Sequence, residues 1–217
     1  MGATRDTPGR EAPRVRDMPA PRKSEGAAGG AAQHVLAWPY RAILAFLLWT
    51  RIRPYQLTLL SLALSVVTGW QILAGHWIVA GLALLASGTC DVFDGSVARH
   101  RGEEKRSGAF LDSVLDRVAD MILFSCLFWA LGTAGHRLDA ALALVTLIVS
   151  LSVSQVRAEA EAVGVTLTEG FFQRLERFLA LLVGLMLPGM MRPVLVALAV
   201  LGGVTVLQRG WSALSQA

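Results

Sequence analysis

Residues 77–134 read WIVAGLALLASGTCDVFDGSVARHRGEEKRSGAFLDSVLDRVADMILFSCLFWALGTA, in which two apolar runs enclose a charged segment. The first run, residues 77–90, and the second, residues 121–134, contain no charged side chain. Each run is shorter than the roughly 20 residues that a helix needs to span a bilayer. We therefore expect both helices to continue into the charged segment, which a polar cavity at one end of a helix bundle would permit.

The charged segment carries aspartates at helical spacing. Asp91 and Asp94 are three residues apart, and Asp112 and Asp116 are four apart, so each pair lies on one face of its helix. The stretch 100–107 contains a glycine and several charges, and it predicts a turn. Two antiparallel helices joined by this turn would bring all four carboxylates together.

Four clustered carboxylates repel one another unless cations balance their charge. Oxygen ligands favour Mg²⁺, Mn²⁺ or Ca²⁺ over zinc, and four carboxylates can hold two ions about 4 Å apart, an arrangement that clamps phosphoryl oxygens. Gly95 and Ala98 leave room for a phosphate or nucleotide, and Arg99 supplies a planar donor fork. The alternative is that the acids form ion pairs with nearby basic residues, namely Arg99, Arg101, Lys105, Arg106 and Arg117.

The rest of the chain is also rich in apolar runs. Apolar residues make up 54% of the sequence and charged residues 17%, with a mean hydropathy of +0.52, whereas a soluble domain carries about 25% charged residues. We predict an all-α membrane protein with six transmembrane helices and no strands. The apolar runs are residues 57–74, 77–90, 121–134, 140–156, 178–187 and 193–207.

The N-terminal region divides into two parts. Residues 1–33 predict a disordered basic tail, because they contain almost no large apolar side chain. Residues 34–50 predict an N-terminal amphipathic helix in the membrane interface, with Trp38, Tyr40 and Trp49 among its apolar residues. A short spanning helix is the alternative for this segment. Residues 51–217 then form the six-helix domain.

The distribution of Lys and Arg predicts the orientation, because these residues accumulate on the cytoplasmic side of membranes. The short links at residues 75–76, 135–137 and 189–192 contain two Arg and no Lys. The opposite links are basic and place both termini and the charged loops in the cytoplasm. Their basic residues are Arg51, Arg53, Arg99, Arg101, Lys105, Arg106, Arg157, Arg174, Arg177 and Arg209.

The net charge of +4 indicates an anionic membrane surface rather than nucleic acid as the partner, because most basic residues flank apolar runs. Cys90 and Cys126 lie inside apolar runs without metal-ligand spacing, and we interpret them as small apolar side chains.

The pattern D-x2-D-G-x2-A-R-x8-G-x3-D-x3-D from Asp91 to Asp116 resembles the signature of CDP-alcohol phosphatidyltransferases at every fixed position. The resemblance implies a homodimer, two Mg²⁺ or Mn²⁺ ions, a CDP-diacylglycerol donor and release of CMP. It also implies that Asp91, Asp94 and Asp112 are metal ligands, and that Asp116 holds the second metal and acts as general base.

The same resemblance implies a nucleotide-binding set that includes a loop before the first spanning helix. Lys105 falls where relatives often carry Thr, and Asp120 continues the four-residue spacing either as support for the site or as a residue facing a wet cavity. The residues that would hold the CDP part are Pro54, Tyr55, Gln56, Leu57, Gly95, Ala98, Arg99, Lys105 and Gly108.

Residues 154–177 resemble the acceptor region of phosphatidylinositol phosphate synthases, which implies that Arg157 and Arg174 bind the phosphate of inositol 1-phosphate. Arg209, in Leu207-Gln208-Arg209 near the end of the last helix, matches a third basic position of the same family. The sequence departs from that pattern at three positions, which hold Glu159, Gln173 and Leu175. Two alternatives stay open: the arginines are cytoplasmic anchors, or the acceptor is glycerol 3-phosphate or another alcohol.

Three functions compete for this chain. The first is the phosphatidyl transfer that the resemblance implies. The second is a catalytically silent membrane scaffold, and the third is a cation transporter that uses the acidic cluster. The intact aspartate pattern favours an enzyme, and its position at one membrane face, beside Gly95, Ala98 and Arg99, favours phosphate chemistry over transport.

Overall fold

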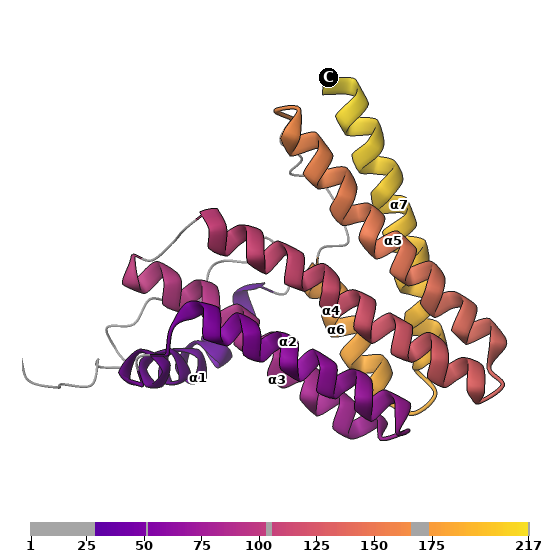
Figure 1. The fold of residues 1–217 in the computed structure, drawn as a ribbon, viewed down its shortest axis with the longest axis horizontal. Coiled ribbons are helices and arrows are strands. Elements are labelled where there is room, and N and C mark those ends of the chain that lie inside the picture. Colours follow the sequence, from indigo (N-terminus) through magenta and orange to yellow (C-terminus); the bar gives the residue numbers. More distant parts are fainter. Residues whose placement is uncertain (1–28, 51, 103–105, 166–173, 217) are drawn as a thin grey trace, which may run out of the picture. The chain divides into compact units, whose positions relative to one another are not determined.

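The structure is a computed structural model that describes residues 29–50, 52–102, 106–165 and 174–216, without the side chains of residues 29–37, 39, 106 and 174. Within these residues the secondary structure is helical and contains no strand, as predicted (Figure 1). The helices are α1 (Gly29–Trp49), α2 (Pro54–Leu73), α3 (Trp77–Arg101), α4 (Arg106–Thr133), α5 (Arg137–Ala162), α6 (Arg174–Met186) and α7 (Met191–Gln216).

Two helices continue from apolar runs into the charged segment, as expected from the length of those runs. Helix α3 has 25 residues and passes through Asp91 to Arg101, and α4 has 28 residues and begins at Arg106. Gly102 follows α3 with a φ of +64°, a left-handed conformation that glycine adopts without steric cost at a helix C-terminus. The predicted turn is therefore shorter than residues 100–107, because both helices extend into it.

Four of the described helices are long and apolar enough to cross a membrane: α2, α3, α5 and α7. Helix α4 is the longest, but Asp112, Asp116, Arg117 and Asp120 make its first half charged. Many large side chains are exposed, including Trp70, Ile78 and Val200. An exposed apolar surface of this extent is typical of contact with lipid.

The described parts of residues 58–91 and 105–217 form one compact unit, which we call the larger unit. In it α5 lies beside both α4 and α7, and α6 packs on α7 (Figure 1). Six helices contribute to one apolar core, including Ile72 from α2, Leu84 from α3, Leu127 from α4 and Leu195 from α7. Small residues allow close approach: a side chain at Gly88 would overlap the ring of Phe178.

The described parts of residues 1–57 and 92–104 form a second compact unit, which we call the smaller unit. Its core joins α1 to the end of α3 and consists of Leu44, Ala45, Leu57, Phe93 and Val97. Helix α1 begins at Gly29, earlier than the predicted start at residue 34, because residues 29–33 are already helical rather than part of a tail.

Candidate metal and phosphate site

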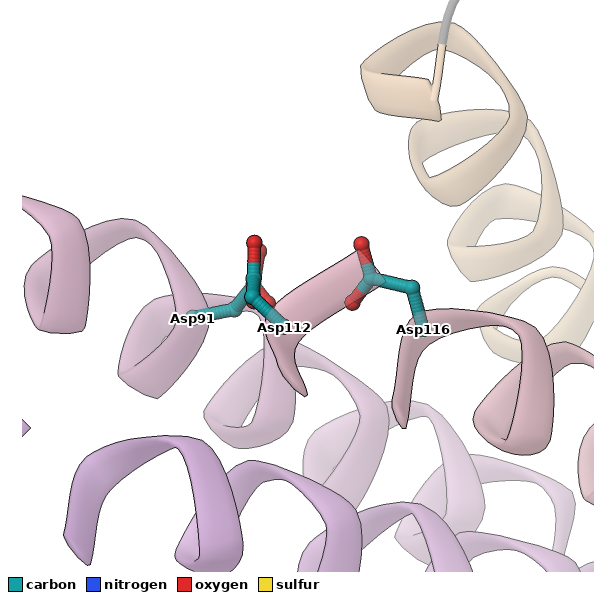
Figure 2. A group of neighbouring side chains, drawn as sticks. All are labelled: Asp91, Asp112 and Asp116. Atoms are coloured by element: carbon teal, nitrogen blue, oxygen red, sulfur yellow. The ribbon is translucent and has the colours of Figure 1, made fainter. Parts of the chain in front are cut away.

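Three aspartates of the larger unit converge. Asp91 lies on α3, and Asp112 and Asp116 lie one turn apart on α4 (Figure 2). Each offers a carboxylate oxygen, and these three oxygens lie within 4.8 Å of one another. We call this group the aspartate triad. All three residues are partly buried, so their carboxylates are sheltered without being sealed from solvent.

The geometry of the triad fits a divalent cation. Two oxygen ligands of one ion lie at most about 4 Å apart around Mg²⁺ and about 5 Å apart around Ca²⁺, and the triad oxygens, within 4.8 Å of one another, lie in or near this range. An all-oxygen donor set selects Mg²⁺, Mn²⁺ or Ca²⁺ rather than zinc or copper. The structure therefore brings together three of the four predicted metal ligands in an arrangement that suits such an ion.

The fourth predicted ligand, Asp94, lies three residues after Asp91 on α3 and is buried. It belongs to the smaller unit together with Gly95, Ala98 and Arg99. The guanidinium of Arg99 passes close to Gly95: a Cβ atom at Gly95 would lie 3.3 Å from Arg99 Nη1. Gly95 thus leaves the space that the arginine side chain occupies.

The segment from Pro54 to Leu57 is the first turn of α2, not a loop before it. Proline suits the first helical position because its fixed φ is helical and its missing N–H is not needed there. Gln56 caps the N-terminus of α2, since its side-chain oxygen accepts a hydrogen bond from the backbone N–H of Arg53 at 2.9 Å. Tyr55 is exposed and Leu57 is buried in the core of the smaller unit.

The structure says little about the two remaining residues that are predicted to bind the nucleotide, Lys105 and Gly108. Lys105 lies outside the described residues. Gly108 is exposed near the start of α4, and a side chain there would meet no atom within 4 Å. The structure therefore shows room at Gly108 but no contact that explains a glycine.

Asp120, the next residue in the register of the triad, makes specific contacts with two other helices. Ser150 on α5 donates a hydrogen bond to Asp120 Oδ2 at 2.6 Å. Arg177 on α6 lies 3.8 Å from the same oxygen and also donates to the hydroxyl of Ser150. Asp120 is thus held by a serine and an arginine, and Arg177 is a candidate site residue that the sequence analysis did not single out.

The three predicted acceptor arginines differ in their surroundings. Arg209 on α7 is buried and donates to the carbonyl oxygen of Val153 at 3.3 Å. Arg157 on α5 is exposed and forms a 2.8 Å ion pair with Glu161. Arg174 begins α6, but its side chain lies outside the description. Arg177 and Arg209 both donate to backbone carbonyl oxygens of α5, those of Ser150 and Val153, at 3.3 Å each.

The alternative of ion pairing with neighbouring bases predicts contacts from Arg99 and Arg117. The guanidinium of Arg117 donates to the carbonyl oxygens of Ser113 and Ser154 at 3.4 and 3.5 Å. The guanidinium of Arg99 donates to the hydroxyl of Ser96 at 3.1 Å. Both arginines therefore have hydrogen-bond partners other than carboxylates.

The larger unit also has a cavity of about 850 Å³ among the links between its helices. It is lined mainly by apolar side chains, with His76, His136 and the ion pair between Asp139 and Arg192 at its polar part. His76 precedes α3, His136 follows α4, and Asp139 and Arg192 lie in the first turns of α5 and α7, all far along the chain from the triad residues. The cavity is therefore separate from the triad.

Comparisons with known proteins agree with this geometry. Residues 51–207 match the family model described as CDP-alcohol phosphatidyltransferase. The chain is 38% identical over 143 residues to a phosphatidylinositol phosphate synthase of Corynebacterium glutamicum, an alignment that spans 64% of this chain and 65% of that protein. It is 40% identical over 138 residues to an archaetidylinositol phosphate synthase of Methanothermobacter thermautotrophicus, covering 61% and 68% of the two chains.

Two solved structures of the Mycobacterium tuberculosis phosphatidylinositol phosphate synthase are similar to this chain. The structure with CDP-DAG bound has a TM-score of 0.72 and 28% identity, and covers 79% of this chain and 92% of that one. The structure in complex with manganese and citrate has a TM-score of 0.71 and 29% identity, and covers 79% and 87%.

Proposed function

The chain belongs to the CDP-alcohol phosphatidyltransferase family, and we propose that it transfers a phosphatidyl group from CDP-diacylglycerol to inositol 1-phosphate and releases CMP. The observation that carries this proposal is the aspartate triad, whose three oxygens lie within 4.8 Å of one another. Similarity to synthases that make inositol phosphate lipids supports the acceptor, and the neighbour with CDP-DAG bound supports the donor.

In this proposal Asp91, Asp94, Asp112 and Asp116 hold two divalent ions, Mg²⁺ or Mn²⁺. Such ions would neutralise charge on the diphosphate of the donor as the bond to CMP breaks. The manganese in the structural neighbour supports a divalent ion. The number of ions rests on the four carboxylates, three of which the structure brings together.

The reaction also needs a base, because an alcohol is a poor nucleophile until its proton is removed. Asp116 lies one helical turn from Asp112, and we assign it this role. The acceptor oxygen forms a bond to the phosphorus of the phosphatidyl group, the bond from that phosphorus to the CMP oxygen breaks, and CMP leaves with the electron pair. The carboxylate of Asp116 takes the proton from the acceptor hydroxyl.

The remaining residues bind the two substrates. The nucleotide contacts Gly95, Ala98, Arg99, Lys105 and Gly108, together with Pro54, Tyr55, Gln56 and Leu57 in the first turn of α2. The phosphate of the acceptor binds Arg209, Arg157 and Arg174. We include Arg177 in this group, because it donates to the carbonyl oxygen of Ser150 on α5, one turn from the carbonyl of Val153 that Arg209 contacts. A dianionic phosphate is recognised best by several charge-assisted donors at once.

The proposed assembly is a multi-pass homodimer in the cell membrane, with six spanning helices and the aspartates facing the cytoplasm. The residues before Gly29 form the basic tail, residues 29–50 the interfacial helix and residues 51–217 the transferase domain. The exposed Trp38, Phe46 and Trp49 of α1 support the interfacial helix, because aromatic side chains favour the membrane–water boundary.

An acceptor screen tests this function. Purified protein in detergent is mixed with CDP-diacylglycerol and one alcohol at a time, and CMP is measured with and without a chelator. We expect metal-dependent CMP release with inositol 1-phosphate and little with inositol or serine. Faster release with glycerol 3-phosphate would change the acceptor but keep the transferase, whereas no release with any alcohol would favour a silent scaffold.

A further inference from the structure

The hydroxyl of Ser96 is the meeting point of three hydrogen bonds in the smaller unit. It donates to the carbonyl oxygen of Val92 one turn back on α3, at 2.9 Å. It accepts from the hydroxyl of Tyr40 at 2.7 Å and from Nη2 of Arg99 at 3.1 Å. A serine hydroxyl has one proton to donate and two lone pairs to accept with. All three are used here, so the direction of each bond is fixed by the other two.

The ring of Tyr40 is also held by apolar packing. Its ring stacks on Phe93, with the ring centroids 5.0 Å apart and the planes at 23°. The same face of α1 packs Leu44 and Ala45 against α3, and both are buried. Removal of the Tyr40 hydroxyl should therefore leave the ring and the helix where they are.

Arg99 is an exposed arginine whose guanidinium has a defined position. It lies over Gly95 and is tied to Ser96. An exposed arginine samples many rotamers, and fixing one of them when a ligand binds costs free energy. A side chain that is already held in one orientation binds its ligand with less of this loss.

We propose that Tyr40 on α1 is a positioning residue for the donor nucleotide: through Ser96 it orients the guanidinium of Arg99 toward the diphosphate of the CDP group. This rests on the proposed function, in which Arg99 contacts the CDP part. It gives the N-terminal helix a role in donor binding in addition to its contact with the membrane.

Two-substrate kinetics on Tyr40→Phe, Ser96→Ala and the double variant test the proposal. Each single variant should raise the KM for CDP-diacylglycerol about three- to tenfold, the effect of one lost neutral hydrogen bond. The kcat and the acceptor KM should change less than twofold. The double variant should match Ser96→Ala, because the Tyr40 hydroxyl acts only through Ser96. Ser96→Thr keeps a hydroxyl and should restore much of the donor affinity.

Thr133→Val is the matched control. Thr133 also donates its hydroxyl to carbonyl oxygens of its own helix, on α4, so its loss should leave both KM values unchanged. Titration with CDP alone gives a second readout without turnover, and Tyr40→Phe should weaken it by the same factor. The proposal is overturned if Tyr40→Phe keeps wild-type donor KM and CDP affinity, or if its effect adds fully to that of Ser96→Ala.

The wild-type protein separates this inference from the proposed function. Wild-type CMP release and CDP binding, with both unchanged in Tyr40→Phe, would remove only the role of Tyr40. A wild-type protein that neither releases CMP nor binds CDP would remove the proposed function and the role of Tyr40 together.

Discussion

The larger unit contains aspartates in two contrasting settings. In the triad, Asp91, Asp112 and Asp116 turn carboxylate oxygens toward one another. Asp139, by contrast, meets Arg192 at two points, with distances of 2.5 and 3.2 Å between their atoms. A cluster of carboxylates suits a shared cation, whereas the guanidinium of Arg192 stabilises the single carboxylate of Asp139. Substitutions in the triad and at Asp139 should therefore have different effects: the first on metal-dependent activity and the second on stability.

Asp120 shares features with both the triad and Asp139. It shares the helical register of the triad on α4, yet it accepts from Ser150 and lies 3.8 Å from Arg177. Its contacts join α4, α5 and α6 beside the aspartates. These contacts favour a supporting role for Asp120 over a residue that only faces a wet cavity.

The largest expected effect comes from Asp112→Asn. The change keeps size and removes one ligand charge, so we expect activity to fall at least about a hundredfold, or about 2.7 kcal/mol of transition-state stabilisation. The measurement is CMP release by purified protein across a range of Mg²⁺ and Mn²⁺ concentrations. Asp139→Asn is the matched control and should keep near-normal turnover, because Asp139 pairs with Arg192. An equal loss of activity in both variants would contradict the assignment of Asp112 as a metal ligand and of Asp139 as a structural residue.

The same comparison applies to the arginines. Arg209 is buried beside Val153, whereas Arg157 is exposed and pairs with Glu161 at 2.8 Å. We expect Arg209→Gln to raise the acceptor KM about tenfold or more, the typical loss of a charge-assisted contact. Arg157→Gln should raise it only about threefold, because binding a phosphate would first have to replace Glu161.

Steady-state kinetics with the phosphorylated alcohol as the varied substrate measures both effects. The donor KM serves as the internal control and should stay constant in both variants. Wild-type acceptor KM in Arg209→Gln would place the acceptor phosphate elsewhere, and the inositol phosphate assignment would then lose its support from this helix.

An intermediate effect is expected from Asp120→Asn. The amide oxygen can still accept from Ser150, but the ion pair with Arg177 is lost. We expect kcat/KM to fall about five- to tenfold, with the metal dependence unchanged. Ser150→Ala tests the same network from α5 and should give a similar loss. A change in the metal concentration needed for half-maximal activity would instead identify Asp120 as a ligand.

The sequence predicted the local part of the site well. The spacing of Asp112 and Asp116 places them on one face because a helix repeats every 3.6 residues, and the short apolar runs correctly required α3 and α4 to extend into the charged segment. The start of α2 was also readable, since Pro54 and Gln56 suit the first and third helical positions. The family resemblance implies a loop at residues 54–57, whereas these two residues favour the helix that the structure shows.

The contacts between residues far apart in the sequence could not be predicted from the sequence. Arg177 reaches Ser150 and Asp120, and Tyr40 reaches Ser96, across separations of 27 to 57 residues that no spacing rule covers. Such contacts depend on how whole helices pack, which is set by many apolar side chains at once. For Arg157 the family resemblance predicts a role in acceptor binding, but the structure shows its guanidinium in an ion pair with Glu161, one helical turn away.

The smallest effect on activity is expected from Arg192→Gln, which tests the structural side of the comparison. The substitution leaves Asp139, which is buried in the first turn of α5, without the guanidinium that binds both of its oxygens. We expect the thermal midpoint of the purified protein to fall by a few degrees, while CMP release per folded molecule stays within twofold. Arg192→Lys keeps the charge but not the two-point geometry, so its thermal midpoint should lie between those of the wild type and Arg192→Gln. Because the pair joins the starts of α5 and α7, the loss should appear in stability and not in either KM. A large change in the KM for the acceptor or the donor would mean that this pair also affects substrate binding, and a purely structural role for Asp139 and Arg192 would then be wrong.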